Sequence, residues 1–388
     1  MRKKIVPVLI RLLFLPMLSL SAESQILSDM ELFNSVYRGS DDWYYAGSGN
    51  ASVTIRSPRD PHVLGQTELE FYPVDIKNTA STGMTTLYVK KAYIRTRMPG
   101  FKLTMGKTRL AWGQGSVFNA GDVIFASLNP VLDLSQSELR SDTAWLTSVN
   151  IPLGNFSFIE AVALPPALDA ETGSIGGLNR SSIGGRGYFL AKGIKFEGGY
   201  LYKGETKGTG DRLGHHPYIS LQGNWGPDWY LASSLAVPTE AQKENDAISD
   251  NWKESWIISF GLYHKQEINR NHTIDFRLET LWFPYQNWED REQRDTIYGV
   301  YFYPEILWAS SSSTFFSLQS VLSPLDASSM ITGGAGWNIY QGLTLLAYCT
   351  FYLGNETSTF SWDRKDLWEA DRDGIQGFSM MTGLRYSF

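Results

Sequence analysis

The sequence predicts an all-β fold: a transmembrane antiparallel up-and-down β-barrel of about 16 strands, within a range of about 14–18. Three observations lead to it. Apolar and polar side chains alternate along most of the chain, as in strands with one apolar face. The alternating segments run for about 10–14 residues, which suits a tilted strand that spans a membrane. Their connections alternate between short turns and long polar loops, so the two rims of the barrel differ.

The composition excludes several other classes of protein. Asp and Glu (40) outnumber Lys and Arg (34), which argues against a nucleic-acid partner. The single cysteine can form neither an internal disulfide nor a cysteine-built zinc site. Beyond residue 24 no apolar window reaches the length of about 18 residues that a membrane helix needs. We therefore expect strands to cross the membrane, and we expect no metal or cofactor.

The first residues have the layout of a secretory signal peptide. Basic residues at 2–4 precede a mostly apolar run at 5–20, and small residues, including Ala22 and Ser24, follow. The alternative is an N-terminal membrane anchor, which Arg11 and Pro16 disfavour because they interrupt the short apolar run. We expect residues 1–24 to be cleaved after export.

The number of strands depends on the segment that follows. About seventeen candidate strands are found, whereas single-chain bacterial barrels have an even number. Omitting 43–56 gives 16 strands, and a partner strand in 25–38 would give 18. Helical spacing of Ile26, Met30, Phe33 and Tyr37 favours a short helix in the N-terminal segment 25–42. We therefore expect 16 strands and assign the barrel domain to 43–388. The candidate strands begin near residues 43, 66, 84, 101, 141, 155, 180, 194, 215, 228, 254, 272, 297, 313, 328, 342 and 375.

The C-terminal segment alternates and ends in an aromatic residue. This resembles the final strand of bacterial outer-membrane barrels, which the barrel-assembly machinery reads. The resemblance implies that Tyr386 and Phe388 form the assembly signal. With the signal peptide, it implies location in the bacterial outer membrane, with outer-membrane lipid as surroundings. One face of this strand carries Phe378, Met380, Thr382, Leu384, Tyr386 and Phe388.

A second resemblance lies in residues 101–134. The run 106–115 reads G-K-T-R-L-A-W-G-Q-G and is followed by Asn119, Asp122 and the pair Asn129 and Pro130. It is similar to a motif of porin-like outer-membrane proteins of diderm bacteria, in which a strand leads into a loop rich in Asn, Pro and Asp. It departs from that motif where the family often has Asn-Pro before the Asp. The resemblance implies architecture and location, and it does not imply a substrate.

Basic residues near this motif are candidates for the pore wall. Arg95, Arg97, Lys102 and Arg109 lie in or beside alternating strands. A charge that faces lipid at mid-bilayer costs about 2–4 kcal/mol, so these side chains should face the lumen. The alternative is that they lie on polar turns at the rim.

The following loop, 113–140, carries several apolar residues, which are unusual in a loop surrounded by solvent. We expect it to fold inward and narrow the pore. Asp122, Asp133 and Glu138 would then face the basic wall and create a field that selects polar or charged solutes.

These features predict a porin-like channel for passive diffusion of small solutes. One alternative is a transporter of hydrophobic substrates with a small N-terminal plug, and another is a surface-exposed adhesin or structural barrel. Enzyme motifs such as G-x-S-x-G, H-E-x-x-H and the P-loop are not found, so we do not expect an enzyme. The sequence leaves open whether the protein forms a homo-oligomer.

Overall fold

The computed structural model describes most of the chain. The predicted signal peptide lies outside the described residues, except for Ser24. The described ranges are 24–38, 43–58, 60–76, 86–126, 128, 130, 142–166, 177, 180–204, 214–239, 252–289, 297–310, 313–354, 358–360 and 377–388.

Within these ranges, eighteen strands form a single antiparallel sheet. A short 3-10 helix, η4 (Trp252–Ser255), precedes β12. The strands are β1 (Gln25–Arg38), β2 (Trp43–Arg56), β3 (Val63–Ile76), β4 (Thr86–Met98), β5 (Phe101–Thr108), β6 (Ala144–Gly154), β7 (Ser157–Leu164), β8 (Ser182–Ala191), β9 (Ile194–Lys203), β10 (Gly214–Asn224), β11 (Asp228–Ser234), β12 (Ile257–Asn269), β13 (His272–Trp282), β14 (Val300–Ala309), β15 (Thr314–Ser323), β16 (Ser328–Tyr340), β17 (Leu343–Leu353) and β18 (Phe378–Ser387).

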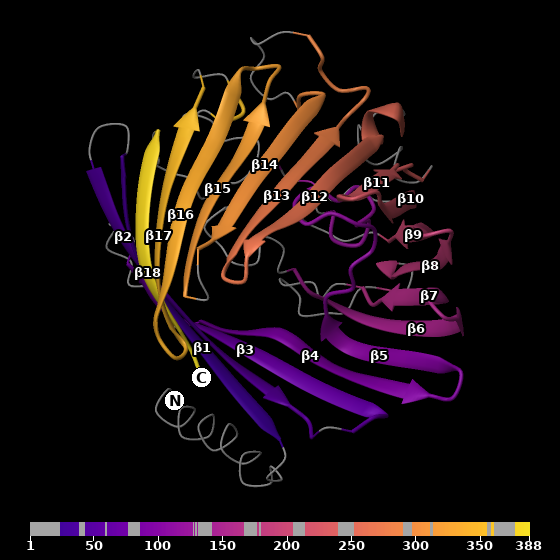
Figure 1. Ribbon diagram of the computed structural model, residues 1–388. Helices are drawn as coiled ribbons and strands as arrows, with labels where there is room; N and C mark the ends of the chain where they lie inside the picture. The colour runs from indigo at the N-terminus through magenta and orange to yellow at the C-terminus, as the bar shows by residue number, and fades with distance from the viewer. Residues whose placement is uncertain are drawn as a thin grey trace.

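The sheet closes on itself to form a barrel (Figure 1). Each strand pairs with its neighbours in sequence, and β1 pairs with both β2 and β18. At this seam Ser28 and Phe388 exchange two backbone hydrogen bonds, of 2.8 and 2.9 Å. Closure pairs the edge strands, which a sheet in lipid requires. The predicted all-β, up-and-down antiparallel barrel is confirmed.

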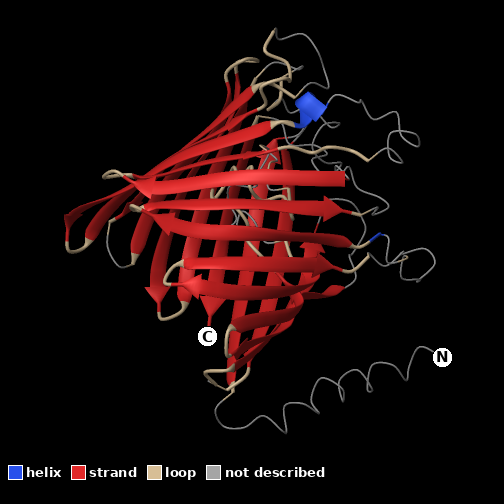
Figure 2. Cartoon of the chain, turned by 90° about the vertical axis from the view of Figure 1, so that its right-hand side faces the viewer, coloured by secondary structure: helices blue, strands red, loops and turns tan. Residues whose placement is uncertain are grey.

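The two rims differ, as the turn pattern predicted. One rim carries turns of a few residues, for example Pro99 with Gly100 and Lys192 with Gly193. We call it the short-turn rim, and the other, which carries most of the long connections, the long-loop rim. Figure 2 shows the strands crossing the wall between the rims.

The strand number lies at the upper end of the predicted range of about 14–18, rather than at the preferred 16, because both doubtful segments are strands. The segment 25–38 is β1 rather than a short helix, and it pairs along its whole length with β2 at 43–56. The apolar residues that suggested a helix lie on opposite faces of β1. Met30 is 41% exposed on the outer face, whereas Phe33 points inward onto Gly383. Because the inner face of β1 is itself partly apolar, its alternation is blurred and the helical spacing is coincidental.

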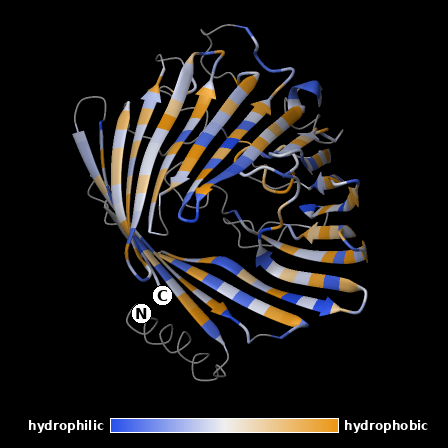
Figure 3. Ribbon diagram, in the orientation of Figure 1, coloured by the Kyte–Doolittle hydropathy of each residue, from blue (hydrophilic) through white to orange (hydrophobic). Residues whose placement is uncertain are grey.

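Hydrophilic and hydrophobic residues alternate along the strands (Figure 3), and the exposed fractions of their side chains show that the outer surface is apolar and the inner face largely polar. Met105 is 52% exposed on the outside, while its neighbour Thr104 is 9% exposed on the inner face. Exposed apolar residues recur in this phase on nearly every strand, for example Leu32, Ile94 and Leu318. No helix in the described ranges is long and apolar enough to cross a membrane.

The buried apolar residues gather on the inner face in two clusters. One surrounds Trp112 and includes Leu146 and Leu201. The other surrounds Phe118 and includes Tyr301 and Phe360. Both clusters contain residues of the connection that follows β5, so this connection fills part of the barrel.

Candidate functional site: an inward-folded loop

The segment after β5 turns into the barrel and lies against its wall beside β10–β12 (Figure 1). We call residues 109–126 the inward loop. Trp112, Val117 and Phe118 are each 0% exposed. Burying side chains of this size stabilises the inward position by about 1.5–3 kcal/mol each. The described part of loop 113–140 thus lies where its apolar content predicted.

Three glycines of the 106–115 motif allow the chain to follow this path. Gly106 has a φ of +127°, and a Cβ there would lie 2.2 Å from the carbonyl oxygen of Ala92. Gly115 has a φ of +128°, and a Cβ there would lie 2.2 Å from the carbonyl oxygen of Phe118. Gly113 has a φ of +68°. Residues with a side chain rarely adopt such angles, so the motif specifies the fold of the inward loop.

The side chain of Asn119 connects two parts of the inward loop, at Trp112 and at Gly121. Its Nδ2 donates a hydrogen bond of 2.9 Å to the carbonyl oxygen of Trp112, and its Oδ1 accepts one of 3.0 Å from the backbone N–H of Gly121. Asn119 is 5% exposed, so these contacts satisfy polar groups that have lost water. Asn119 therefore stabilises the conformation of the loop through contacts within the loop itself.

Two wall carboxylates hold the beginning of the inward loop. Glu160 of β7 accepts a hydrogen bond of 3.2 Å from the indole N–H of Trp112. Glu197 of β9 accepts one of 2.9 Å from the backbone N–H of Gly113. Both glutamates are at most 5% exposed, and buried carboxylates are stable only where donors and opposite charges surround them.

Arg186 of β8 supplies the opposite charge. Its Nε lies 2.7 Å from Glu160 and its Nη1 lies 2.9 Å from Glu197. The same Nη1 donates to the carbonyl oxygen of Ala111 at 2.9 Å. The Tyr218 hydroxyl donates to Glu197 at 2.5 Å, and its ring stacks on Trp112 with centroids 5.6 Å apart. One guanidinium therefore joins two wall strands to the inward loop.

A third carboxylate, that of Glu279 on β13, binds the tip of the inward loop, which we define as residues 116–120. Glu279 is 2% exposed. Two neutral side chains also bind the tip. The Tyr230 hydroxyl donates a hydrogen bond of 2.8 Å to the carbonyl oxygen of Phe118, and Ser259 accepts one of 3.0 Å from the N–H of Ala120. Glu279 accepts hydrogen bonds of 3.0, 2.9 and 2.7 Å from the backbone N–H groups of Ser116, Val117 and Phe118.

Arg109 and Asp122 form an ion pair within the inward loop. The two side chains meet at 2.8 Å, and that of Asp122 is only 1% exposed. The guanidinium also lies over the ring of Phe125, 4.8 Å from its centroid. Both residues were predicted to line the pore on opposing sides. They instead neutralise each other, so Arg109 is not a free charge of the wall.

The other three basic residues lie together on β4 and β5. The register places Arg95 opposite Thr104 and Arg97 opposite Lys102, on the inner face of the sheet. Arg95 donates a weak hydrogen bond of 3.4 Å to Thr104. All three are exposed, and within the described ranges none forms an ion pair with a carboxylate. We call Arg95, Arg97 and Lys102 the basic trio, and it lies toward the short-turn rim.

The inward loop does not bind the wall that was expected. Its hydrogen bonds run to β7, β8, β9, β11, β12 and β13, and none runs to the basic trio. The expected field between acidic loop residues and the basic wall is therefore replaced, at Asp122, by a local ion pair. Asp133 and Glu138 lie outside the described residues.

Sequence reasoning missed the residues that hold the loop. These are Glu160, Arg186, Glu197 and Glu279. The available signal was a charged residue in the middle of a strand, on its polar face. That position predicts an inward side chain, but it does not reveal which loop the side chain binds.

Charges on β3 and β4 pair with each other. Lys90 lies 2.8 Å from Glu70, and Lys91 lies 3.0 Å from Glu68. Across the ranges the structure describes, no group of His, Cys, Asp and Glu side chains is arranged to hold a metal ion.

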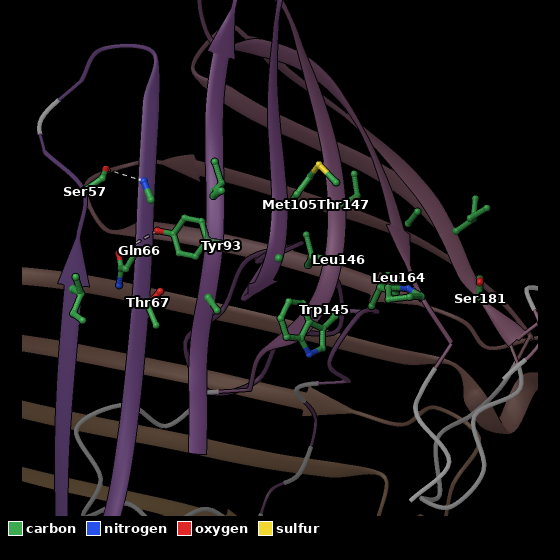
Figure 4. Close-up of a pocket in the computed structure, with 18 residues that line it drawn as sticks. Ser57, Gln66, Thr67, Tyr93, Met105, Trp145, Leu146, Thr147, Leu164 and Ser181 are labelled. Atoms are coloured by element: carbon green, nitrogen blue, oxygen red, sulfur yellow. Dashed lines mark hydrogen bonds between the residues drawn. The ribbon is translucent and has the colours of Figure 1, made fainter. Parts of the chain in front are cut away.

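A groove of about 910 Å³ runs over β2–β8 (Figure 4). Ile94, Met105, Trp145 and Ile183 line it, and each is at least 52% exposed in the outer apolar row. None of the described residues that line the groove is charged. Its exposed apolar residues belong to the outer surface of the barrel, so the inward loop and the basic trio remain the candidate site.

Comparison with known proteins agrees with this architecture. No protein-family model and no curated protein matches the sequence. OccAB3 of Acinetobacter baumannii is similar in structure, with a TM-score of 0.54 and 10% identity over 95% of this chain and 100% of that chain. OccAB4 of the same organism gives a TM-score of 0.53 and 11% identity over 95% and 99%. At this identity the likeness establishes the fold alone, and that fold is the closed antiparallel β-barrel described above.

Proposed function

We propose that the protein is an outer-membrane channel through which small polar solutes diffuse passively. The observation that carries the proposal is a loop bound inside a closed barrel. The outer face is apolar, whereas the inner face carries charged and polar side chains that would be unfavourable in lipid. A polar lumen suits water and polar solutes, and the inward loop narrows it.

The basic trio gives the channel a preference for anions. Arg95, Arg97 and Lys102 carry positive charge on the inner face, and no carboxylate in the described part of the chain neutralises them. Uncompensated charge in a confined aqueous passage raises the local concentration of counter-ions. In the same proposal, lipid surrounds the apolar outer face, and the assembly machinery recognises Tyr386 and Phe388.

Ion conductance of the purified protein in planar bilayers tests this function. We expect stable unitary currents, with a reversal potential in a salt gradient that indicates anion preference. A folded barrel without currents would contradict the channel. Binding of hydrophobic compounds by that silent barrel would then favour the hydrophobic-substrate transporter, and binding to surfaces through its loops would favour the adhesin.

A further inference from the structure

We propose that Glu279 sets the width of the pore: its carboxylate is the anchor of the inward loop and occupies an anion-binding nest formed by three successive backbone amides. This inference rests on the proposed channel for its effect on conductance. The anchoring itself is a separate physical claim, because it can be measured without any current.

The tip of the inward loop has the form of an anion receptor. The N–H groups of Ser116, Val117 and Phe118 converge on one carboxylate at 2.7–3.0 Å. Successive backbone N–H groups that point to one place make a concavity that attracts anions. Gly115, with its φ of +128°, gives the chain the turn that precedes these amides.

Glu279 fills this receptor from a distant part of the sequence. It lies on β13, more than 160 residues from the tip. Among the described residues, the nearest cation is Arg277, with its Nε 3.9 Å from Oε1 of Glu279. The amides are therefore the main partners of its charge. Hydrogen bonds to a charged group are about twice as strong as neutral ones, and their loss would leave three N–H groups unsatisfied.

Nearby contacts do not replace this anchor. Two neutral hydrogen bonds also hold the tip, from the Tyr230 hydroxyl to the carbonyl oxygen of Phe118 and from the N–H of Ala120 to Ser259, and each is weaker than a bond to a charged group. Val117 and Phe118 pack into the buried cluster with Tyr303 and Leu281, but apolar contact has no directional preference. The contacts of Arg186 and Glu197 hold residues 111–113 at the other end of the loop. Removing Glu279 should therefore release the tip while the beginning of the loop stays bound.

The experiment measures the accessibility of a thiol at the tip. Val117→Cys is placed in a Cys349→Ser background, because Val117 is 0% exposed while the tip is bound. Adding Glu279→Ala should raise the modification rate by a water-soluble thiol reagent roughly 10- to 100-fold, the factor for one lost hydrogen bond to a charged group. Single-channel conductance should rise in parallel. The matched control is Glu305→Ala on β14, which removes a carboxylate that pairs with Arg277 at 2.7 Å.

Chemical rescue distinguishes a bound carboxylate from general packing. Acetate has the atoms that Glu279→Ala removes, so it should return the thiol rate toward its starting value, whereas chloride at equal ionic strength should not. An unchanged rate in Glu279→Ala, an equal rise in Glu305→Ala, or a rise that acetate does not reverse would each overturn the proposal. If Glu279→Ala fails to assemble, Glu279→Gln replaces it: a smaller rise supports the anchor, and no rise overturns it. A wild-type protein that carries no current would contradict the channel function and leave the thiol result valid.

Discussion

Two parts of the barrel wall use their inward charges in different ways. On β7–β13, which we call the loop-bearing wall, Glu160, Glu197 and Glu279 accept hydrogen bonds from the inward loop. On β1–β5, which we call the self-paired wall, Glu68 and Glu70 pair with lysines of the neighbouring strand. Carboxylates of the first wall therefore position a loop, whereas those of the second pair with lysines and leave the basic trio without a carboxylate partner.

Replacing Arg186 should give the largest difference in stability between the two walls. Arg186→Met leaves Glu160 and Glu197 buried without their opposite charge, and breaking such a pair costs about 3–5 kcal/mol. The matched change on the self-paired wall is Lys91→Met, whose ion pair to Glu68 is more exposed and should be worth about 1 kcal/mol. Urea midpoints of the detergent-solubilised barrels measure both losses. Equal losses would show that the walls do not differ in this way.

A glycine of the motif should have the next largest effect. Gly115→Ala combines a φ of +128° with a Cβ 2.2 Å from the backbone of Phe118, so the tip cannot keep its conformation. We expect the binding of the inward loop to the wall to weaken by roughly 3 kcal/mol. The rate of thiol modification at Val117→Cys should rise accordingly. The control is Gly226→Ala in a short turn, where φ is +101° but no atom lies within 4 Å. Its effect on thiol accessibility should be negligible, and a similar rise there would contradict the steric explanation.

The sequence alone predicted the strands of the barrel wall, but it did not predict the contacts between that wall and the inward loop. Each predicted strand corresponds to one of β2–β18, because an apolar outer face and a largely polar inner face impose alternation on the strands. β1 was missed because Phe33 and Tyr37 make its inner face apolar as well. Phe33 packs on Gly383, and Tyr37 stacks on Tyr44 with centroids 5.6 Å apart.

The candidate site was predictable only where it depended on local pattern. Apolar content located the inward loop, and alternation placed Arg95, Arg97 and Lys102 on the inner face. The partners of the loop depend on contacts such as the one between Glu279 and Phe118, which are far apart in sequence. A single sequence carries no local signal for such a pair, and for the same reason the ion pair of Arg109 with Asp122 was not foreseen.

Charge reversal in the basic trio should have the smallest effect on stability and a clear effect on selectivity. Arg97 and Lys102 lie opposite each other in the register, so two like charges already face one another across β4 and β5. Arg97→Glu would place a carboxylate opposite Lys102 and make the pair neutral, while Arg97→Glu with Lys102→Glu would make it negative. The anion preference should therefore fall in two steps, measured as the reversal potential of planar bilayers in a salt gradient. Because both positions are exposed, stability should change by only about 0.5 kcal/mol or less. Arg270→Glu, in the exposed turn between β12 and β13, is the control for a change in charge outside the lumen. If Arg270→Glu moves the reversal potential as far as the double variant does, the selectivity reflects the rim, and the basic trio does not face the path of the ions.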